Sequence, residues 1–260
     1  MTEDRATDGA TMKGKVALVT GGGTGIGRAA ALGFAKKGAS VMLAGRRQAE
    51  LNAVVAEIVS RGGEAAAIKT DIALEADVVA LVKGTVERFG RLDGAFNNAA
   101  ASHGGLIETL NTADFDTVMG INVRGVWMLI QQEVIAMRAL GHGGAIVNTS
   151  SIAATGGNAG LSIYGTSKGA LDTMIRHVAL EVGGDAIRIN NVSPGVTRTP
   201  MTAAWPDEVF AAIREHTALK RIAEPDDVGD VAVWLCTDEA RFVTGQSILV
   251  DGGYNIGGRR

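Results

Sequence analysis

Residues Lys15–Gly27 read KVALVTGGGTGIG. The β-branched and aliphatic run Lys15–Thr20 predicts a short buried strand, which stops at three consecutive glycines. The residues that follow, Arg28–Lys37, have helical composition. Glycines let a backbone approach a pyrophosphate, and a helix N-terminus offers free N–H groups and a positive dipole end. This strand, glycine turn and helix therefore predict a dinucleotide site, with a merely tight turn as the alternative.

Strand and helix patterns alternate along the rest of the chain. Further strands are expected at Ala39–Ala44, Glu64–Ile68, Leu92–Phe96, Gly144–Ser150, Ala186–Val192 and Ser247–Val250. Helices are expected at Gln48–Arg61, Glu75–Phe89, Thr112–Arg138, Ile163–Val182, Asp207–Thr217 and Glu224–Cys236. Such alternation indicates a parallel sheet covered on both faces. We therefore expect an α/β fold: a single-domain, Rossmann-type, doubly wound parallel sheet of about seven strands, spanning 13–260, with a mobile lid over the substrate at 200–223.

Composition excludes several classes of protein. The chain has 260 residues, 46% of them apolar, and a net charge of −3 with acids and bases mixed. This balance argues against nucleic acid or an anionic membrane as partner. The single cysteine, Cys236, fits a reducing compartment, so we expect a cytoplasmic protein. Residues 1–12 are polar and are interpreted as a disordered N-terminal tail.

The end of the second expected strand bears on the choice of cofactor. It reads Gly45-Arg46-Arg47, at the position where an acid would bind the ribose 2′-hydroxyl of NAD and an arginine would accommodate the 2′-phosphate of NADP. The acid is absent, and two guanidinium groups suit a phosphate. The alternative is that both arginines begin the exposed face of the next helix. We expect NADP(H) to be preferred, with NAD(H) as the alternative.

A second stretch, Ser151–Lys168, reads SIAATGGNAGLSIYGTSK. Tyr164 and Lys168 are i and i+4 neighbours on one face of the expected helix. An ammonium group there favours the phenolate, so we expect it to lower the pKa of Tyr164. Ser151 follows a buried strand and would emerge at its end. An ordinary exposed Tyr–Lys pair is the alternative, and the surrounding motifs argue against it.

Taken in order, these motifs resemble the short-chain dehydrogenase/reductase family, in its glucose-dehydrogenase and 3-oxoacyl-reductase-like group. The resemblance runs from about Lys15 to Gly253, and Ser151 lies 13 residues before Tyr164, as in the family. The matching motifs are TGGGTGIG at 20–27, Asp71, NNAA at 97–100, Asn122, Ser151, YGTSK at 164–168, SPG at 193–195, Thr199 and VDGG at 250–253. Ala100 and Thr197 depart from the usual family residues, glycine and an aliphatic residue.

The resemblance implies a role for each matching residue. Tyr164 would be the general acid/base, Ser151 would hold the reacting oxygen, Lys168 would bind the nicotinamide ribose, and Asn122 would support a water-linked proton relay. The residues expected to bind the cofactor are Gly21, Thr24, Gly25, Ile26, Gly27, Arg46, Arg47, Asp71, Ile72, Asn98, Ala99, Tyr164, Lys168, Pro194, Gly195, Val196, Thr197 and Thr199. The family also implies a homotetramer, with the Thr112–Arg138 and Ile163–Val182 helices between subunits.

Five residues are expected to shape the substrate pocket: His103, Asn158, Ile163, Met201 and Trp205. The alternatives are that His103 is a solvated loop histidine and that Trp205 is ordinary packing. The histidines and Cys236 lack metal-ligand spacing, so no metal is expected.

The sequence thus predicts an NADP(H)-preferring oxidoreductase that interconverts a secondary alcohol or diol and its ketone. One alternative is an NAD-dependent alcohol, sugar or cyclic-diol dehydrogenase. Another is a non-catalytic nucleotide-binding sensor, which would have no need of a reactive phenol beside a nicotinamide.

Overall fold

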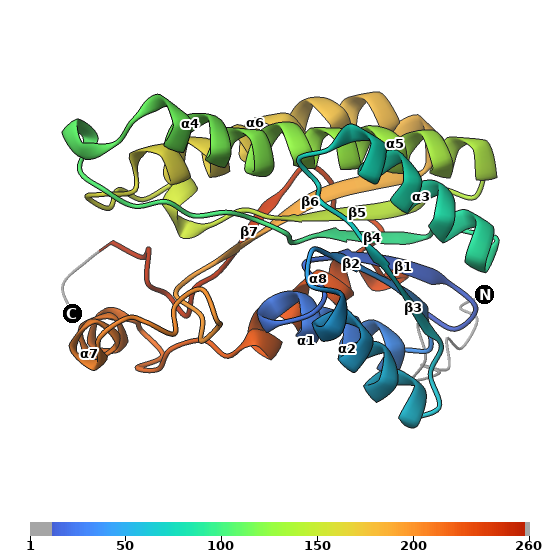
Figure 1. Cartoon of the computed structure of the whole chain (residues 1–260), viewed down its shortest axis with the longest axis horizontal. Coiled ribbons are helices and arrows are strands. Elements are labelled where there is room, and N and C mark those ends of the chain that lie inside the picture. Colours follow the sequence, from blue (N-terminus) through green and yellow to red (C-terminus); the bar gives the residue numbers. More distant parts are fainter. Residues whose placement is uncertain (1–11, 258–260) are drawn as a thin grey trace, which may run out of the picture.

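The computed structural model describes residues 12–257 and contains one seven-stranded parallel sheet (Figure 1). The strand order is β3-β2-β1-β4-β5-β6-β7. The strands are β1 (Val16–Thr20), β2 (Ser40–Gly45), β3 (Ala65–Lys69), β4 (Gly94–Asn97), β5 (Gly144–Thr149), β6 (Ile187–Pro194) and β7 (Ser247–Val250). The expected doubly wound α/β sheet is confirmed.

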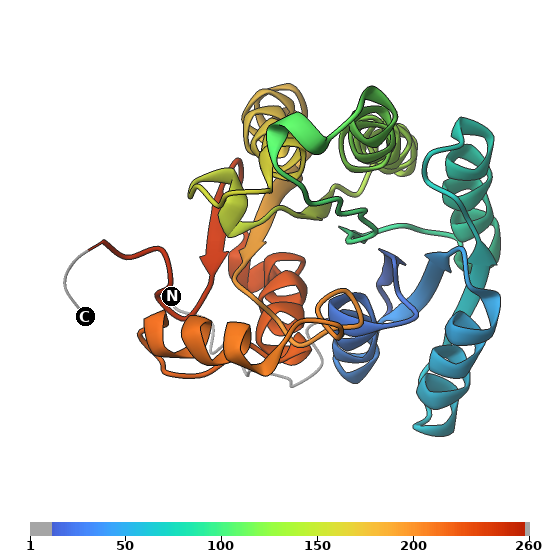
Figure 2. The same cartoon turned by 60° about the vertical axis from the view of Figure 1, so that its left-hand side comes forward.

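Helices cover both faces of the sheet, as Figures 1 and 2 show. One face carries α1 (Gly25–Lys36), α2 (Gln48–Ser60) and α8 (Pro225–Leu235), and the other carries α3 (Glu75–Phe89), α5 (Val126–Leu140) and α6 (Ser162–Val182). Each face has its own apolar core, because side chains alternate along every strand. In β4, Phe96 packs with α1 and α8, while Ala95 packs with α3, α5 and α6.

The helix predicted at Thr112–Arg138 contains a π-helical segment in its middle. It consists of α4 (Thr112–Met119), a π-helical segment η2 (Gly120–Gly125) and α5. Glycines begin and end the π segment, and a Cβ on Gly125 would lie 2.8 Å from the carbonyl oxygen of Ile72. The backbone thus stays helical throughout the predicted range, with a π turn whose extra residue periodicity alone does not detect.

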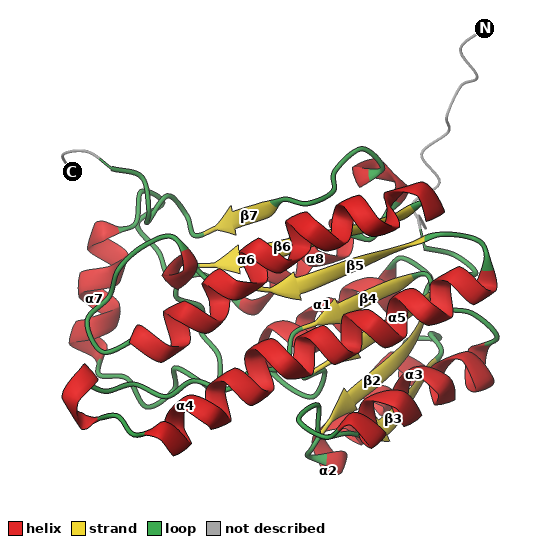
Figure 3. Ribbon diagram, turned by 90° about the horizontal axis from the view of Figure 1, so that it is seen from above, coloured by secondary structure: helices red, strands yellow, loops and turns green. Residues whose placement is uncertain are grey.

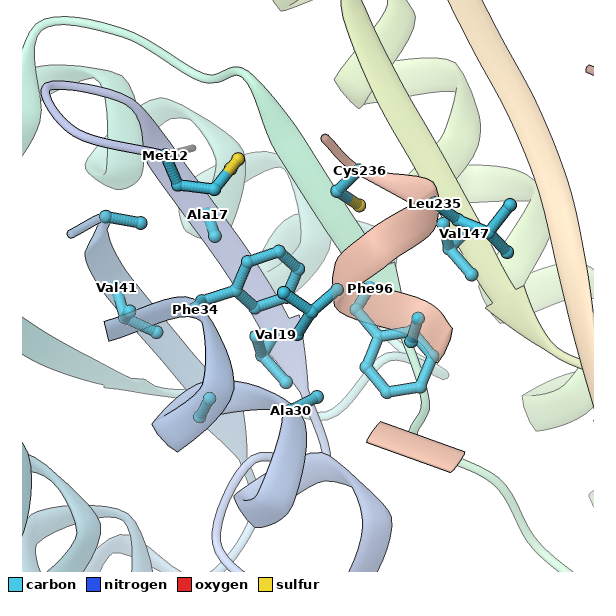
Figure 4. Packing of buried hydrophobic residues seen from close by; sticks show 14 of the residues in the cluster. Met12, Ala17, Val19, Ala30, Phe34, Val41, Phe96, Val147, Leu235 and Cys236 are labelled. Atoms are coloured by element: carbon cyan, nitrogen blue, oxygen red, sulfur yellow. The ribbon is translucent and has the colours of Figure 1, made fainter. Parts of the chain in front are cut away.

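The described part of the chain begins at Met12, one residue before the expected start of the domain. Of the predicted tail, residues 1–11 lie outside the described part. Met12 is fully buried, and its N–H donates to the carbonyl of Lys37 at 3.0 Å. Figure 4 shows its side chain beside Ala17 in the core beneath α1 and α8. Met12 thus belongs to the folded domain.

The sheet order places the ends of β1 and β4 at a switch point. The connection from β1 leads to the α1 face, and the connection from β4 leads to α5 on the opposite face. Ligands of open α/β sheets bind at such points, beyond the carboxyl ends of the strands. The strand arrows in Figure 3 all point toward the end that α7 (Asp207–His216) and α4 flank. Between Met12 and Gly257, no helix has the length and apolar content that crossing a bilayer requires.

Candidate active site

The glycine turn after β1 packs too closely for side chains. Gly21 and Gly25 have φ values of 64° and 53°, which glycine adopts without strain. A Cβ on Gly27 would lie 2.2 Å from the carbonyl oxygen of Gly21. The turn therefore opens directly onto the N-terminus of α1, with Thr24 as its N-cap residue. Free N–H groups and the positive end of the helix dipole face whatever binds there.

A cavity of about 950 Å³ lies at this edge of the sheet. The loops after strands β1 to β6 form its walls, and the segment around α7 borders one end. The predicted residues that line it are Gly21, Thr24, Gly25, Ile26, Arg46, Arg47, Asp71, Ile72, Asn98, Ala99, Ser151, Asn158, Tyr164, Lys168, Pro194, Gly195, Val196, Thr197, Thr199, Met201 and Trp205. Segments far apart in the sequence thus meet in one place.

Both arginines after β2 reach one end of this cavity. Both are exposed, and Arg47 Nη2 lies 2.8 Å from Glu50 Oε2 and 3.4 Å from Thr24 Oγ1. Asp71 is fixed nearby, because its Oδ1 accepts from the N–H of Ala73 at 3.0 Å. Glu50 also lines the cavity and was not predicted. This end therefore presents two cations together with two acids, Glu50 and Asp71.

Asn98 joins the glycine turn to the neighbouring strands. Its N–H donates to Thr20 Oγ1 at 3.0 Å, and its Oδ1 accepts from Thr149 Oγ1 at 3.3 Å. A Cβ on Gly21 would lie 2.8 Å from Asn98 Nδ2. Asn98 therefore packs against the glycine turn and fixes β1, β4 and β5 relative to one another.

Ser151, Tyr164 and Lys168 come together in the middle of the cavity wall. Ser151 Oγ accepts from the N–H of Ala153 at 3.1 Å, so its own hydrogen is free to bond to the Tyr164 hydroxyl. Lys168 is fully buried, and its Nζ donates to the carbonyl of Thr149 at 2.7 Å. Nζ lies 5.6 Å from the centre of the Tyr164 ring. Burial of the ammonium next to the phenol follows from their spacing on α6.

The pKa of Tyr164 differs from the value that its spacing from Lys168 predicted. Burial raises the pKa of Tyr164, and the hydrogen bond with Ser151 only partly opposes this change. The expected lowering by Lys168 is thus wrong for the protein alone, because removing the phenol from water outweighs it. Burial also lowers the pKa of Lys168 to about 8, against the attraction of Asp172.

Asn122 lies behind the cavity rather than in its wall. It is completely buried, and its Nδ2 donates to Ser167 Oγ at 3.0 Å and to the carbonyl of Ala101 at 2.8 Å. Its Oδ1 accepts from the N–H of Ala101 at 2.8 Å. The Asn122 side chain therefore ties the loop after β4 to α6, through the π-helical segment that carries it.

Three other predicted residues do not line the cavity. Gly27 lies beneath the glycine turn. Ile163 is buried in α6 beside lining residues. His103 is half exposed, with its Nε2 3.5 Å from Asp114 Oδ1, in agreement with the alternative of a loop histidine.

The walls also contain residues that the sequence analysis did not single out for this site. These are mainly Glu50, Leu161, Val209, Ile213 and Tyr254. An acid three residues after Arg47 was visible in the sequence, but Tyr254 follows the last motif and gave no signal.

The structure fits a nicotinamide dinucleotide. The glycine turn after β1 admits only glycine at Gly27, and the helix N-terminus that follows faces the cavity. A buried lysine, Lys168, lies beside Tyr164 and Ser151. A fold and site of this kind define an NAD(P)-dependent oxidoreductase that acts on CH–OH and C=O groups.

Comparisons with known proteins agree with this class. A family model described as enoyl-(acyl carrier protein) reductase matches residues 21–255. The A-factor type gamma-butyrolactone 1'-reductase (1S-forming) of Streptomyces virginiae is 40% identical over 93% of this chain and 96% of its own. The meso-2,3-butanediol dehydrogenase of Serratia marcescens is 36% identical over 92% of this chain and 94% of its own.

A solved structure is similar over almost its whole length. It is a short-chain type dehydrogenase/reductase from Mycobacterium marinum, with a TM-score of 0.92 and 31% identity, covering 96% of this chain and 99% of its own. The chain belongs to the short-chain dehydrogenase/reductase family.

Proposed function

We propose that the protein is an NADP(H)-preferring oxidoreductase that interconverts a secondary alcohol or diol and its ketone, using Ser151, Tyr164, Lys168 and Asn122. The main support is that the hydroxyl groups of Ser151 and Tyr164 line the same cavity, beside the buried Lys168. Two hydroxyl groups that converge on one point suit a carbonyl oxygen on which negative charge develops.

In the reductive direction, Tyr164 gives its proton to the carbonyl oxygen while Ser151 holds that oxygen by a hydrogen bond. The bound cofactor supplies the hydride. The ammonium of Lys168 then stabilises the phenolate that remains. The Asn122 side chain is fully engaged with Ala101 and Ser167, so its part in a proton relay would fall to its main chain. Oxidation runs through the same groups in reverse.

The proposed preference for NADP(H) rests on Arg46 and Arg47. Both line the cavity, and the guanidinium group of Arg46 is exposed to a phosphate placed there. One observation favours the alternative, an NAD-dependent alcohol, sugar or cyclic-diol dehydrogenase: Glu50 lines the same end and pairs with Arg47 at 2.8 Å. A carboxylate there would accept from ribose hydroxyls and repel a 2′-phosphate.

Equilibrium binding of NADPH and NADH to wild type and Arg46→Ala tests this choice. A hydrogen bond to a charged group contributes about 1.5–3 kcal/mol, so loss of Arg46 should weaken NADPH roughly 10- to 100-fold and NADH little. Arg176→Ala, an exposed arginine on α6, is the matched control. Equal losses for both cofactors, or tighter binding of NADH by the wild type, would favour the NAD-dependent alternative.

The substrate end of the cavity is mostly apolar. Met201, Trp205, Val209, Ile213 and Tyr254 line it, and the Trp205 and Phe210 rings are 6.0 Å apart. We propose that residues 200–223 act as a lid on this end. The named relatives act on a butyrolactone and on a small diol. Turnover should be measured on ketones, diketones and cyclic diols, and absence of turnover on all of them would contradict the proposal.

We further propose a cytoplasmic homotetramer with α4, α5 and α6 between subunits. Large apolar side chains are exposed on these helices: Phe115 on α4, Trp127 and Ile135 on α5, and Leu180 on α6, the last 87% exposed. Burial of such residues would stabilise an interface. Sedimentation equilibrium gives the mass directly, and a monomer at micromolar concentration would contradict this assembly.

A further inference from the structure

A row of polar side chains crosses the sheet beneath α5 and α6. Asn97 of β4 is the register partner of Asn148 in β5, which is the partner of Asn191 in β6. Asn191 in turn is the partner of Ser247 in β7. The three asparagines are 2% exposed or less. Amides placed side by side in a dry core must hydrogen-bond to one another or to further partners.

Asp172 of α6 terminates this row at one end. Its Oδ1 accepts from Asn191 Nδ2 at 2.9 Å, from Ser247 Oγ at 2.7 Å and from Ser150 Oγ at 2.8 Å. Three donors on one oxygen stabilise a carboxylate over a carboxylic acid. We therefore take Asp172 to be the anion of the row.

Asp172 also fixes the direction of the amides. A carboxylate only accepts, so Asn191 must turn its Nδ2 toward it. Asn191 Oδ1 then accepts from Asn148 Nδ2 at 3.0 Å, and Asn148 Oδ1 accepts from Asn97 Nδ2 at 3.1 Å. The N–H ends of the amide dipoles thus point toward Asp172, and their C=O ends point away from it. This order favours a negative charge at Asp172.

Glu133 of α5 lies at that other end and is completely buried. Its Oε2 accepts from Asn97 Nδ2 at 3.0 Å. Glu133 Oε1 and Asn97 Oδ1 are both buried without a hydrogen-bond partner. Both are acceptors, and they belong to planar groups already joined by one hydrogen bond. A single proton on Glu133 Oε1 would give each of them a partner.

Within residues 12–257, no cation pairs with Glu133 to compensate an ionised form. The neighbouring helix α3 faces the core with Val78, Leu81, Val82 and Thr85. Strand β4 faces Glu133 with the amide of Asn97, which also bonds to Asn148 of β5. Across the sheet, the Cys236 thiol is held neutral by a pKa raised to about 12. Burial raises the pKa of Glu133 to about 7, against only the hydrogen bond from Asn97.

We propose that Glu133 is a neutral carboxylic acid that donates its proton to Asn97 Oδ1, and that this pair, through Asn148 and Asn191, keeps the negative charge of the row on Asp172. Asp172 attracts the ammonium of Lys168, one helical turn earlier on α6, and so opposes the lowering of its pKa by burial. Glu133 is thus a positioning residue for Lys168. That last link rests on the proposed function, whereas the protonation of Glu133 does not.

Infrared spectroscopy tests the protonation directly. Wild type at pH 6 should show the C=O band of a protonated, buried carboxyl group, and the band should disappear as the pH rises through about 7. Glu133→Gln should lack the band. Glu239→Gln, the same change at an exposed carboxylate, should keep it. Absence of the band in wild type, or its persistence in Glu133→Gln, would overturn the proposal.

Unfolding measurements give a second, independent readout. The folded state holds this proton more tightly than the unfolded state, so its contribution to stability is lost as the pH rises through about 7. Between pH 6 and 8 the unfolding constant of wild type should rise about tenfold more than that of Glu133→Gln. The amide of glutamine can replace the neutral acid at both contacts with Asn97. A glutamine variant that fails to fold at pH 7 would therefore also overturn the proposal.

The link to Lys168 has its own readout. In wild type, Glu133 ionises above pH 7 and disturbs the row of amides that ends at Asp172. The pH at which kcat falls on the alkaline side should therefore be higher in Glu133→Gln than in wild type. If kcat falls at the same alkaline pH in both proteins while the infrared band behaves as expected, Glu133 acts only within the core and not on Lys168. If no carbonyl substrate is turned over, the proposed function fails, while the infrared and unfolding results still decide the protonation.

Discussion

Replacement of Lys168 by methionine is the sharpest test of the electrostatics of the site. Burial lowers the pKa of Lys168 from 10.5 to about 8. The pKa of Lys168 is lower in the folded state than in the unfolded state. The folded protein therefore bears no penalty from Lys168 above the unfolded pKa of 10.5, and it loses stability as the pH falls from there through about 8. Each pKa unit corresponds to about 1.36 kcal/mol, so the full penalty at neutral pH is roughly 3.4 kcal/mol.

The measurement is urea unfolding of wild type and Lys168→Met between pH 7 and 10. Methionine leaves the carbonyl of Thr149 without its 2.7 Å partner, but this cost does not depend on pH. Wild type should therefore gain about 2.5 kcal/mol relative to the variant across this range. Activity at neutral pH should be lost in Lys168→Met, although the variant gains stability relative to wild type there. A stability difference that stays constant with pH would refute the reasoning.

Three further substitutions address other parts of the site. Tyr164→Phe should keep cofactor affinity and lose at least about 100-fold in turnover, the usual contribution of a general acid; full activity would contradict its role. Gly27→Ala places a Cβ 2.2 Å from the carbonyl oxygen of Gly21; overpacking costs about 1–3 kcal/mol, so calorimetry should show cofactor affinity roughly 10-fold weaker. Gly120→Ala, which meets no atom within 4 Å, is its control and should bind normally. Asn122→Leu should lower the free energy of unfolding by roughly 2–5 kcal/mol, since it orphans buried polar groups at about 1–3 kcal/mol each; an unchanged midpoint in urea would show that the tie to Ala101 is not needed.

The sequence predicted the parts of the fold that depend on local pattern. Short apolar runs bounded by glycine located all seven strands within one or two residues, as at Ser247–Val250. It also predicted most of the cavity, because carboxyl ends of parallel strands meet at one edge. The π-helical segment escaped prediction, since its apolar spacing over a few residues resembles that of an α-helix.

Other features depend on the register between strands, which a single sequence does not state. Asn97, Asn148 and Asn191 lie 51 and 43 residues apart, and only strand pairing makes them neighbours. The pKa of Tyr164 was misjudged for a related reason. The i+4 spacing of Lys168 was visible in the sequence, but the extent to which both groups are removed from water was not.

The π-helical segment Gly120–Gly125 has a consequence for insertions and deletions. A π turn holds one residue more than the α turn that it replaces. Deleting one residue here would restore a regular helix and rotate everything on one side by about 100° relative to the other. Asn122 would then turn away from Ala101, or Glu133 would turn away from the sheet. A single deletion between α4 and α5 should therefore be far more harmful than one in an exposed loop, and the length of this segment should resist change as the protein evolves.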